Sequence, residues 1–121
     1  MIVSKTVKFD AAHLLPYYEG KCQNLHGHTW KVEVAVEGPV NKKTGMVVDF
    51  SWLKYLLNTE VVEKFDHTYL NDWYKNPTAE MLAEYIFDTI KNEWIQSSEE
   101  PIQLKWVKVW ESDDSYVMEA E

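Results

Sequence analysis

Two of the four histidines in this chain stand close to its only cysteine, in the segment Cys22-Gln-Asn-Leu-His26-Gly-His28. A third, His13, precedes this segment. Histidine is the side chain that most often binds a metal as a neutral ligand, and zinc readily accepts imidazole nitrogen. Side chains two positions apart on a strand point to the same face, so His26 and His28 can hold one ion there. With His13 as a third ligand, the pattern predicts a zinc centre.

Three histidines and one open position are typical of a catalytic zinc ion, which polarises a substrate oxygen and lowers the pKa of that group. One alternative is a closed structural zinc in which Cys22 joins the three histidines, although closed sites usually contain more than one cysteine. A second alternative is that His13 is only a packed core residue.

Cys22 and the adjacent pair Asp66-His67 are the other residues suited to chemistry. A cysteine near a metal and a histidine can have a lowered pKa and act as a base or nucleophile. Neighbouring side chains usually diverge, so Asp66 and His67 serve one site only if the backbone turns there. The simpler interpretations are a small buried apolar Cys22 and a His67 that stabilises the negative end of a helix.

The elements that must position these residues follow from the apolar periodicity. Alternation predicts a first strand through Val3, Val7 and Phe9, a loop over residues 11–25, and a second strand over residues 30–36. Helical spacing runs over residues 50–65, with Asp49 or Ser51 as the N-cap. The stripe predicted to be buried on this helix is Phe50, Leu53, Leu56, Leu57, Val61 and Phe65.

A second helix is predicted after Thr78, a suitable N-cap, with Glu80 in its first turn. Its predicted buried stripe is Leu82, Tyr85, Ile86, Ile90 and Trp94. A third strand places Leu104, Trp106 and Trp110 on one face and Gln103, Lys105 and Glu111 on the other. An edge strand follows over residues 116–118.

This β-β-α-α-β-β order predicts a single α+β domain over residues 1–121 with an antiparallel sheet. Two helices can cover only one face of such a sheet, so we expect oligomerisation to cover the other face.

The composition of the 121 residues is that of a folded globular domain, with 45% hydrophobic and 26% charged residues. The net charge is −8 without a basic run, which argues against a nucleic-acid partner. A single cysteine allows no internal disulfide, and the first ten residues lack the apolar core of a secretory signal. No apolar run reaches transmembrane length, so we expect no membrane partner and a cytoplasmic location.

Six motifs in order resemble the 6-pyruvoyltetrahydropterin synthase / 6-carboxytetrahydropterin synthase family. They are Phe9-Asp-Ala-Ala-His13, Cys22-x3-His26-Gly-His28, Thr44-Gly-Met-Val-Val-Asp49-Phe50, Asp66-His67-x2-Leu70-Asn71, Pro77-Thr-Ala-Glu80 and Val109-Trp-Glu111. The resemblance extends over nearly the whole chain.

The resemblance implies that His13, His26 and His28 bind zinc and that Cys22 abstracts a proton. It also implies that Asp66 and His67 relay protons and that Glu111 anchors the pterin. The implied fold is the tunnelling fold, a four-stranded antiparallel sheet with two helices on one face. In this family three subunits close their sheets into a barrel, two trimers stack into a hexamer, and active sites lie between subunits.

The three residues between Cys22 and His26 resemble the 6-carboxytetrahydropterin synthases of the queuosine (7-deazaguanine) pathway. The implied reaction converts 7,8-dihydroneopterin triphosphate to 6-carboxy-5,6,7,8-tetrahydropterin, acetaldehyde and triphosphate. Alternatives are a 6-pyruvoyltetrahydropterin synthase, a non-catalytic zinc module and a metal-dependent hydrolase. With all positive charge on lysine, the candidates for triphosphate binding are Lys21, a lysine of another subunit, and the helix N–H groups near Thr78.

Overall fold

The computed structural model describes residues 1–121 and is built on a five-stranded sheet in the order β3-β1-β2-β4-β5. The long strands β1, β2, β4 and β5 pair antiparallel, and the two-residue β3 pairs parallel with β1. The strands are β1 (Ile2–His13), β2 (His26–Glu37), β3 (Thr68–Tyr69), β4 (Gln103–Ser112) and β5 (Ser115–Ala120). The prediction of four antiparallel strands was therefore wrong in one respect, because it lacked the parallel edge strand β3.

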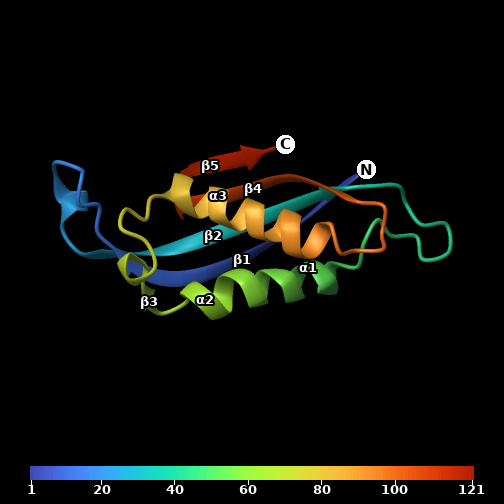
Figure 1. The fold of residues 1–121 in the computed structure, drawn as a ribbon, viewed down its shortest axis with the longest axis horizontal. Coiled ribbons are helices and arrows are strands. Elements are labelled where there is room, and N and C mark those ends of the chain that lie inside the picture. Colours follow the sequence, from blue (N-terminus) through green and yellow to red (C-terminus); the bar gives the residue numbers. More distant parts are fainter.

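Two helical rods lie side by side over one face of the sheet (Figure 1). The first comprises α1 (Phe50–Leu57), a π-helical segment (Asn58–Val62) and α2 (Glu63–Phe65). The second comprises α3 (Ala79–Thr89) and a π-helical segment (Ile90–Ile95). Short 3-10 turns occur at Lys21–Gln23 and Leu70–Asp72. None of the helices combines the length and the apolar character needed to cross a membrane.

The predicted N-caps are confirmed at both rods. The Asp49 carboxylate accepts a hydrogen bond from the Ser51 backbone N–H at 2.8 Å, and the Thr78 hydroxyl oxygen accepts one from the Met81 N–H at 3.1 Å. Each cap satisfies one of the N–H groups that a helix start leaves without an intrahelical partner. The predicted apolar stripes also face the sheet, except that Phe50 is 56% exposed and Tyr85 and Trp94 are half-buried.

The core lies between these rods and the sheet and consists of 21 buried residues. Trp30, Val32 and Val34 from β2 are fully buried, as are Val107 and Val109 from β4. Phe9 stacks with Trp30 on the neighbouring strand, with ring centroids 6.1 Å apart. This apolar layer supports the end of the sheet where the three histidines lie.

The loop predicted over residues 11–25 begins later than expected, because β1 continues to His13. Ala11, Ala12 and His13 pair with His28, Gly27 and His26 of β2. Ala11 and Ala12 do not alternate between apolar and polar residues, so the sequence carries no strand signal there, yet their backbones pair with β2. The remaining loop extends past one end of the sheet, and the loop of residues 38–49 lies at the opposite end (Figure 1).

The faces predicted for β4 were wrong for its second half. The register between β2 and β4 shifts at Ala35/Val36, so that Ala35 pairs with Trp106 while Val36 pairs with Leu104. A bulge of this kind inserts one residue and reverses the alternation beyond it. Leu104 is buried before the bulge and Val107 and Val109 after it. By the same alternation Glu111 points to the helix-covered face, and not to the face predicted for it.

Candidate metal centre

The strand register brings His13, His26 and His28 together on one face of the sheet. His13 is the direct cross-strand partner of His26, and His28 lies two residues further along β2. Ring centroids of the three imidazoles are 4.6 to 5.1 Å apart. The face is the one that carries Trp30, whose ring contacts those of His13 and His28 edge-on. The sequence prediction that these histidines converge is confirmed.

Backbone carbonyls fix the tautomers of two of these rings. The Nδ1 atom of His13 lies 2.9 Å from the Pro77 carbonyl oxygen, and that of His26 lies 2.7 Å from the Asn24 carbonyl oxygen. A carbonyl oxygen can only accept a hydrogen bond, so each Nδ1 carries the proton. The Nε2 atom of each ring then has a free lone pair. This arrangement is typical of histidines that bind metal ions.

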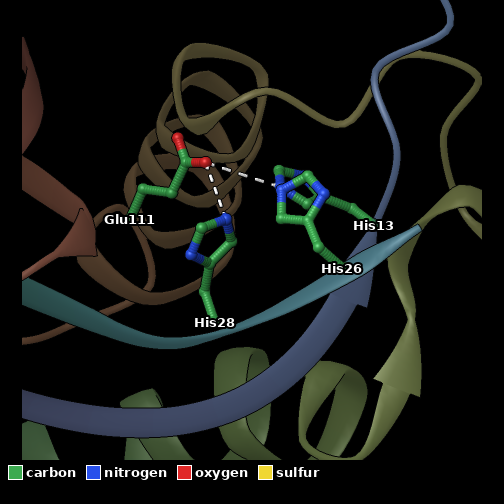
Figure 2. A group of neighbouring side chains, drawn as sticks. All are labelled: His13, His26, His28 and Glu111. Atoms are coloured by element: carbon green, nitrogen blue, oxygen red, sulfur yellow. Dashed lines mark ion pairs between the residues drawn. The ribbon is translucent and has the colours of Figure 1, made fainter. Parts of the chain in front are cut away.

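The Nε2 atoms of His13, His26 and His28 are buried and have no hydrogen-bond partner. Buried polar atoms are rarely left without one, because their desolvation is not compensated. Glu111 from β4 completes the group, and its Oε1 lies 2.9 Å from His28 Nε2 and 3.5 Å from His13 Nε2 (Figure 2). These contacts are ion-pair distances without hydrogen-bond alignment. The four potential ligand atoms lie within 4.8 Å of one another, so the residues fit a bound metal ion.

The electrostatics also favour the protonation states that a metal requires. Burial lowers the pKa of His28 below its usual value, against an opposing contribution from Glu111, and the neighbouring histidines lower it further. The pKa of Glu111 is lowered as well, chiefly by its interaction with His13, and also by His28 and His26. Neutral imidazoles and an ionised carboxylate are the ligand forms.

Asn71 fastens the end of β1 next to His13. Its side-chain carbonyl accepts a hydrogen bond from the Leu14 N–H at 3.0 Å, and its amide group donates to the Leu14 carbonyl at 2.9 Å. Both backbone groups of the residue after His13 are thus held by one side chain. Sequence reasoning assigned Asn71 no role, although it ends the motif that begins with the Asp66-His67 pair.

Asp66 and His67 form a second group, and their side chains meet despite being adjacent. The His67 backbone has a positive φ of 59°, which turns the chain so that His67 Nδ1 lies 2.9 Å from Asp66 Oδ2. The interaction with Asp66 raises the pKa of His67. The Asp66 pKa is lowered, first by the hydrogen bond it accepts from the Asp10 N–H at 2.9 Å and then by His67.

Asp10 is a residue that sequence reasoning missed. Its N–H donates to Asp66, its carbonyl accepts from the His67 N–H at 2.6 Å, and its carboxylate lies within 4.8 Å of the ligand atoms of both residues. The Asp10 carboxylate also accepts a hydrogen bond from the Thr29 hydroxyl on β2. The sequence signals were an acidic residue on the polar side of a strand, which is common, and its place within the motif Phe9-Asp-Ala-Ala-His13.

Asp10, whose backbone holds Asp66 and His67, points to the sheet face opposite the three histidines. Asp10 and Thr29 are cross-strand partners and alternate with the positions that carry His13 and His28. They line an open depression of about 550 Å³ together with Gly27, His28, Thr68 and His67, whose side chain is 79% exposed. The Asp66-His67 pair is therefore not among the groups that converge with the three histidines, although His67 and His28 line the same depression.

The remaining predicted site residues lie near the histidines in sequence or in space, but outside the cluster. Cys22 lies half-buried in the 3-10 turn Lys21–Gln23, and its sulfur is not among the atoms that converge with the histidines. The alternative of a closed site made by Cys22 and three histidines therefore lacks its fourth ligand. Lys21 is exposed. Thr78 follows Pro77, which contacts His13, and its hydroxyl is occupied in capping α3.

Comparison with known proteins decides the family of this chain. The family model described as 6-pyruvoyl tetrahydropterin synthase matches residues 2–121. The chain belongs to the 6-pyruvoyl tetrahydropterin synthase family.

Relatives within this family match over nearly their whole length. A protein of Archaeoglobus fulgidus named as a putative 6-carboxy-5,6,7,8-tetrahydropterin synthase is 40% identical over 116 residues, covering 96% of this chain and 92% of the relative. The 6-carboxy-5,6,7,8-tetrahydropterin synthase of Haemophilus influenzae is 32% identical, covering 94% of each chain. Among solved structures, Caenorhabditis elegans 6-pyruvoyl tetrahydropterin synthase superposes with a TM-score of 0.83 at 26% identity, covering 100% of this chain and 95% of that one.

Proposed function

We propose that this chain is a zinc-dependent 6-carboxytetrahydropterin synthase acting in 7-deazaguanine (queuosine) biosynthesis. It would convert 7,8-dihydroneopterin triphosphate and water to 6-carboxy-5,6,7,8-tetrahydropterin, acetaldehyde and triphosphate. The observation that carries this proposal is the convergence of three buried, unpartnered His Nε2 atoms in a member of this family. The relatives named 6-carboxytetrahydropterin synthase support the choice of product.

Zinc is the metal that the ligand atoms favour, because imidazole nitrogens with one carboxylate oxygen are an accepted zinc donor set. His13, His26 and His28 would hold it, and the bound ion would polarise the substrate's side-chain hydroxyls and lower their pKa. The hydrogen bonds from Nδ1 of His13 and His26 to backbone carbonyls fix the rings for this task.

The chemistry of the substrate suggests a role for each of the other site residues. A carboxylate pairs naturally with the 2-amino group and ring N–H of a pterin, and Glu111 would supply it. The Cys22 thiolate would remove a carbon-bound proton next to the ring imine, where the ring system absorbs the negative charge. His67, oriented by Asp66, would carry protons to and from the side-chain oxygens before a retro-aldol cleavage releases acetaldehyde.

We infer that the complete site is shared between subunits of a homohexamer built as a dimer of trimers. Support comes from the division of the site within one chain, since Asp10, Asp66 and His67 form a cluster separate from the three histidines, and Asp10 points to the opposite face of the sheet. A relay histidine that is 79% exposed also needs a covering surface before it can exclude water from a proton transfer. A neighbouring chain would provide that surface.

Subunit complementation tests the shared site. Cys22→Ala and His67→Ala chains, each inactive alone, should regain activity when they are co-expressed or refolded together, because some interfaces then contain both intact residues. Mixtures that stay inactive although mass spectrometry under native conditions shows mixed oligomers would overturn the shared site.

The reaction itself is tested by product analysis. The zinc-loaded protein should yield the 6-carboxy product from 7,8-dihydroneopterin triphosphate, with acetaldehyde trapped in equal amount. A Cys22→Ala variant should keep its zinc and lose turnover, whereas zinc loss in that variant would favour a site in which Cys22 is a ligand.

A 6-pyruvoyl synthase is the second candidate, and the likeness to the Caenorhabditis elegans protein of that name favours it. This reaction keeps all three side-chain carbons of the substrate. A pyruvoyl product without acetaldehyde would decide for it, and no turnover at all would favour the non-catalytic zinc module.

A further inference from the structure

Glu111 lies where a fourth metal ligand would lie beside the three histidines. Its Oε1 atom lies 2.9 Å from His28 Nε2 and 3.5 Å from His13 Nε2, and Figure 2 shows it facing the point where the imidazoles meet. Zinc bonds of about 2.0–2.2 Å in a tetrahedron place neighbouring ligand atoms about 3.3–3.6 Å apart. The 3.5 Å separation lies within this range and the 2.9 Å separation below it, and all four ligand atoms lie within 4.8 Å of one another, so small side-chain shifts would let one ion contact all four groups.

The charges around Glu111 also favour a metal ion at this point. The Glu111 carboxylate lies within ion-pair distance of His13 and His28 and of no lysine. The Glu111 carboxylate, which is 31% exposed, faces the Nε2 atoms of His13 and His28, and neither nitrogen has a hydrogen-bond partner. A divalent ion at this point would give the partly buried carboxylate a cationic partner.

The bulge in β4 is the structural cause of this placement. The register shift at Ala35/Val36 puts Glu111 on the same face as Val107 and Val109, at the end of the strand next to the histidines. Without the extra residue, the carboxylate would point to the opposite face. The β4 bulge therefore adds a fourth potential ligand to a three-histidine site.

We propose that Glu111 is the fourth metal ligand while no pterin is bound, and that the metal and the pterin compete for this one carboxylate. The second half rests on the proposed function, in which Glu111 pairs with the pterin. A site closed by four protein ligands offers the ion no open position for water. Departure of Glu111 to the pterin opens that position only when a substrate has arrived.

Metal affinity tests the first half without any turnover. Competition with a chromophoric chelator measures zinc binding by the wild-type chain, by Glu111→Gln and by Asp113→Asn. Asp113 lies exposed in the β4–β5 turn and lies outside the cluster, so its variant matches the charge change. We expect Glu111→Gln to bind zinc at least tenfold more weakly and Asp113→Asn to bind it as the wild type does. Equal affinity in all three chains, or no zinc binding by the wild type, would overturn the proposal.

Cobalt substitution tests the competition. The visible absorption of the Co²⁺-loaded protein reports the ligands of the ion, so added 7,8-dihydroneopterin should change the spectrum of the wild type. The Glu111→Gln spectrum should differ from that of the wild type before the pterin is added and respond less to it. A wild-type spectrum that stays constant while pterin fluorescence shows binding would overturn the competition. A protein that responds to pterin but does not turn over would overturn the proposed reaction alone.

Discussion

The His13 Nδ1 atom lies 2.9 Å from the carbonyl oxygen of Pro77, a residue 64 positions later in the chain. This contact ties the end of β1 to the segment that begins α3, and it orients the ring for metal binding. Because His26 and His28 come from β2 and Glu111 from β4, a bound ion would join three strands at one end of the sheet. Metal binding and folding stability should therefore be coupled.

Metal removal should destabilise the protein. A ligand present at about 100 times its dissociation constant stabilises the folded state by about 2.7 kcal/mol, so a chelator should lower the melting temperature by several degrees. Calorimetry of the zinc-loaded and chelator-treated wild type measures this difference. His13→Ala should show no response to the chelator, whereas His67→Ala, which lies outside the cluster, should respond as the wild type does. An identical response of both variants would contradict the assigned ligands.

Substitution of Asn71 should weaken the metal centre without touching a ligand. Asn71→Ala removes both hydrogen bonds to the backbone of Leu14 and leaves the end of β1 free to shift. We expect zinc affinity to fall about 10- to 100-fold, as is usual when groups that orient metal ligands are lost, and stability to fall by about 1–3 kcal/mol. Chelator competition and denaturant unfolding give the two quantities. Unchanged zinc affinity in a destabilised variant would limit Asn71 to a structural role.

Much of this site was predictable from the sequence, because its main determinants are local. The spacing of His26 and His28 fixes their common face, and Thr78 and Asp49 lie at the helix starts where their side chains can cap. What could not be predicted depends on partners distant in the sequence. The face of Glu111 follows from a bulge opposite Ala35/Val36, and no periodicity within β4 reveals it. The contact between Asp66 and His67 needs the left-handed backbone of His67, which residue types alone do not indicate.

The pKa of His67 should fall when Asp66 is neutralised. The structure raises the pKa of His67 above its ordinary value of 6.5, chiefly through Asp66 and also through Asp10. Asp66→Asn should lower the pKa of His67 most of the way back to its ordinary value, and Asp10→Asn should lower it less. NMR titration of the His67 ring measures both changes. Because the folded-state pKa is raised, the protonated ring stabilises the fold below pH 6.5, and this contribution is lost as the pH rises through the folded-state pKa. An unchanged titration in Asp66→Asn would contradict the pairing.

A buried polar network between the two helical rods should be needed for stability. Glu60, which is only 7% exposed, accepts hydrogen bonds from Trp94 Nε1 at 3.2 Å and from Lys64 Nζ at 2.7 Å. Lys64 also donates to the Tyr85 hydroxyl. Glu60→Ala leaves the lysine and the indole without their acceptor, so we expect a loss of about 2–4 kcal/mol in the free energy of unfolding. Denaturant unfolding measures this loss, and Glu63→Ala on the same rod is the control.

Thr78 was predicted to help bind the triphosphate, and its surroundings lead to a different expectation. Its hydroxyl already caps α3, and the cavity of about 100 Å³ beside the start of that helix is lined by Glu80 and Glu111. Two carboxylates would repel a polyphosphate more than one helix start attracts it. Thr78→Ala should therefore lower stability by about 1 kcal/mol, and Thr78→Ser should restore it, while the KM for the triphosphate substrate stays unchanged in both. A KM that rises severalfold in Thr78→Ala and recovers in Thr78→Ser would assign the hydroxyl to the substrate after all. In that case Glu80→Gln alone should lower the KM below that of the wild type, because it removes a negative charge on α3 that repels the triphosphate.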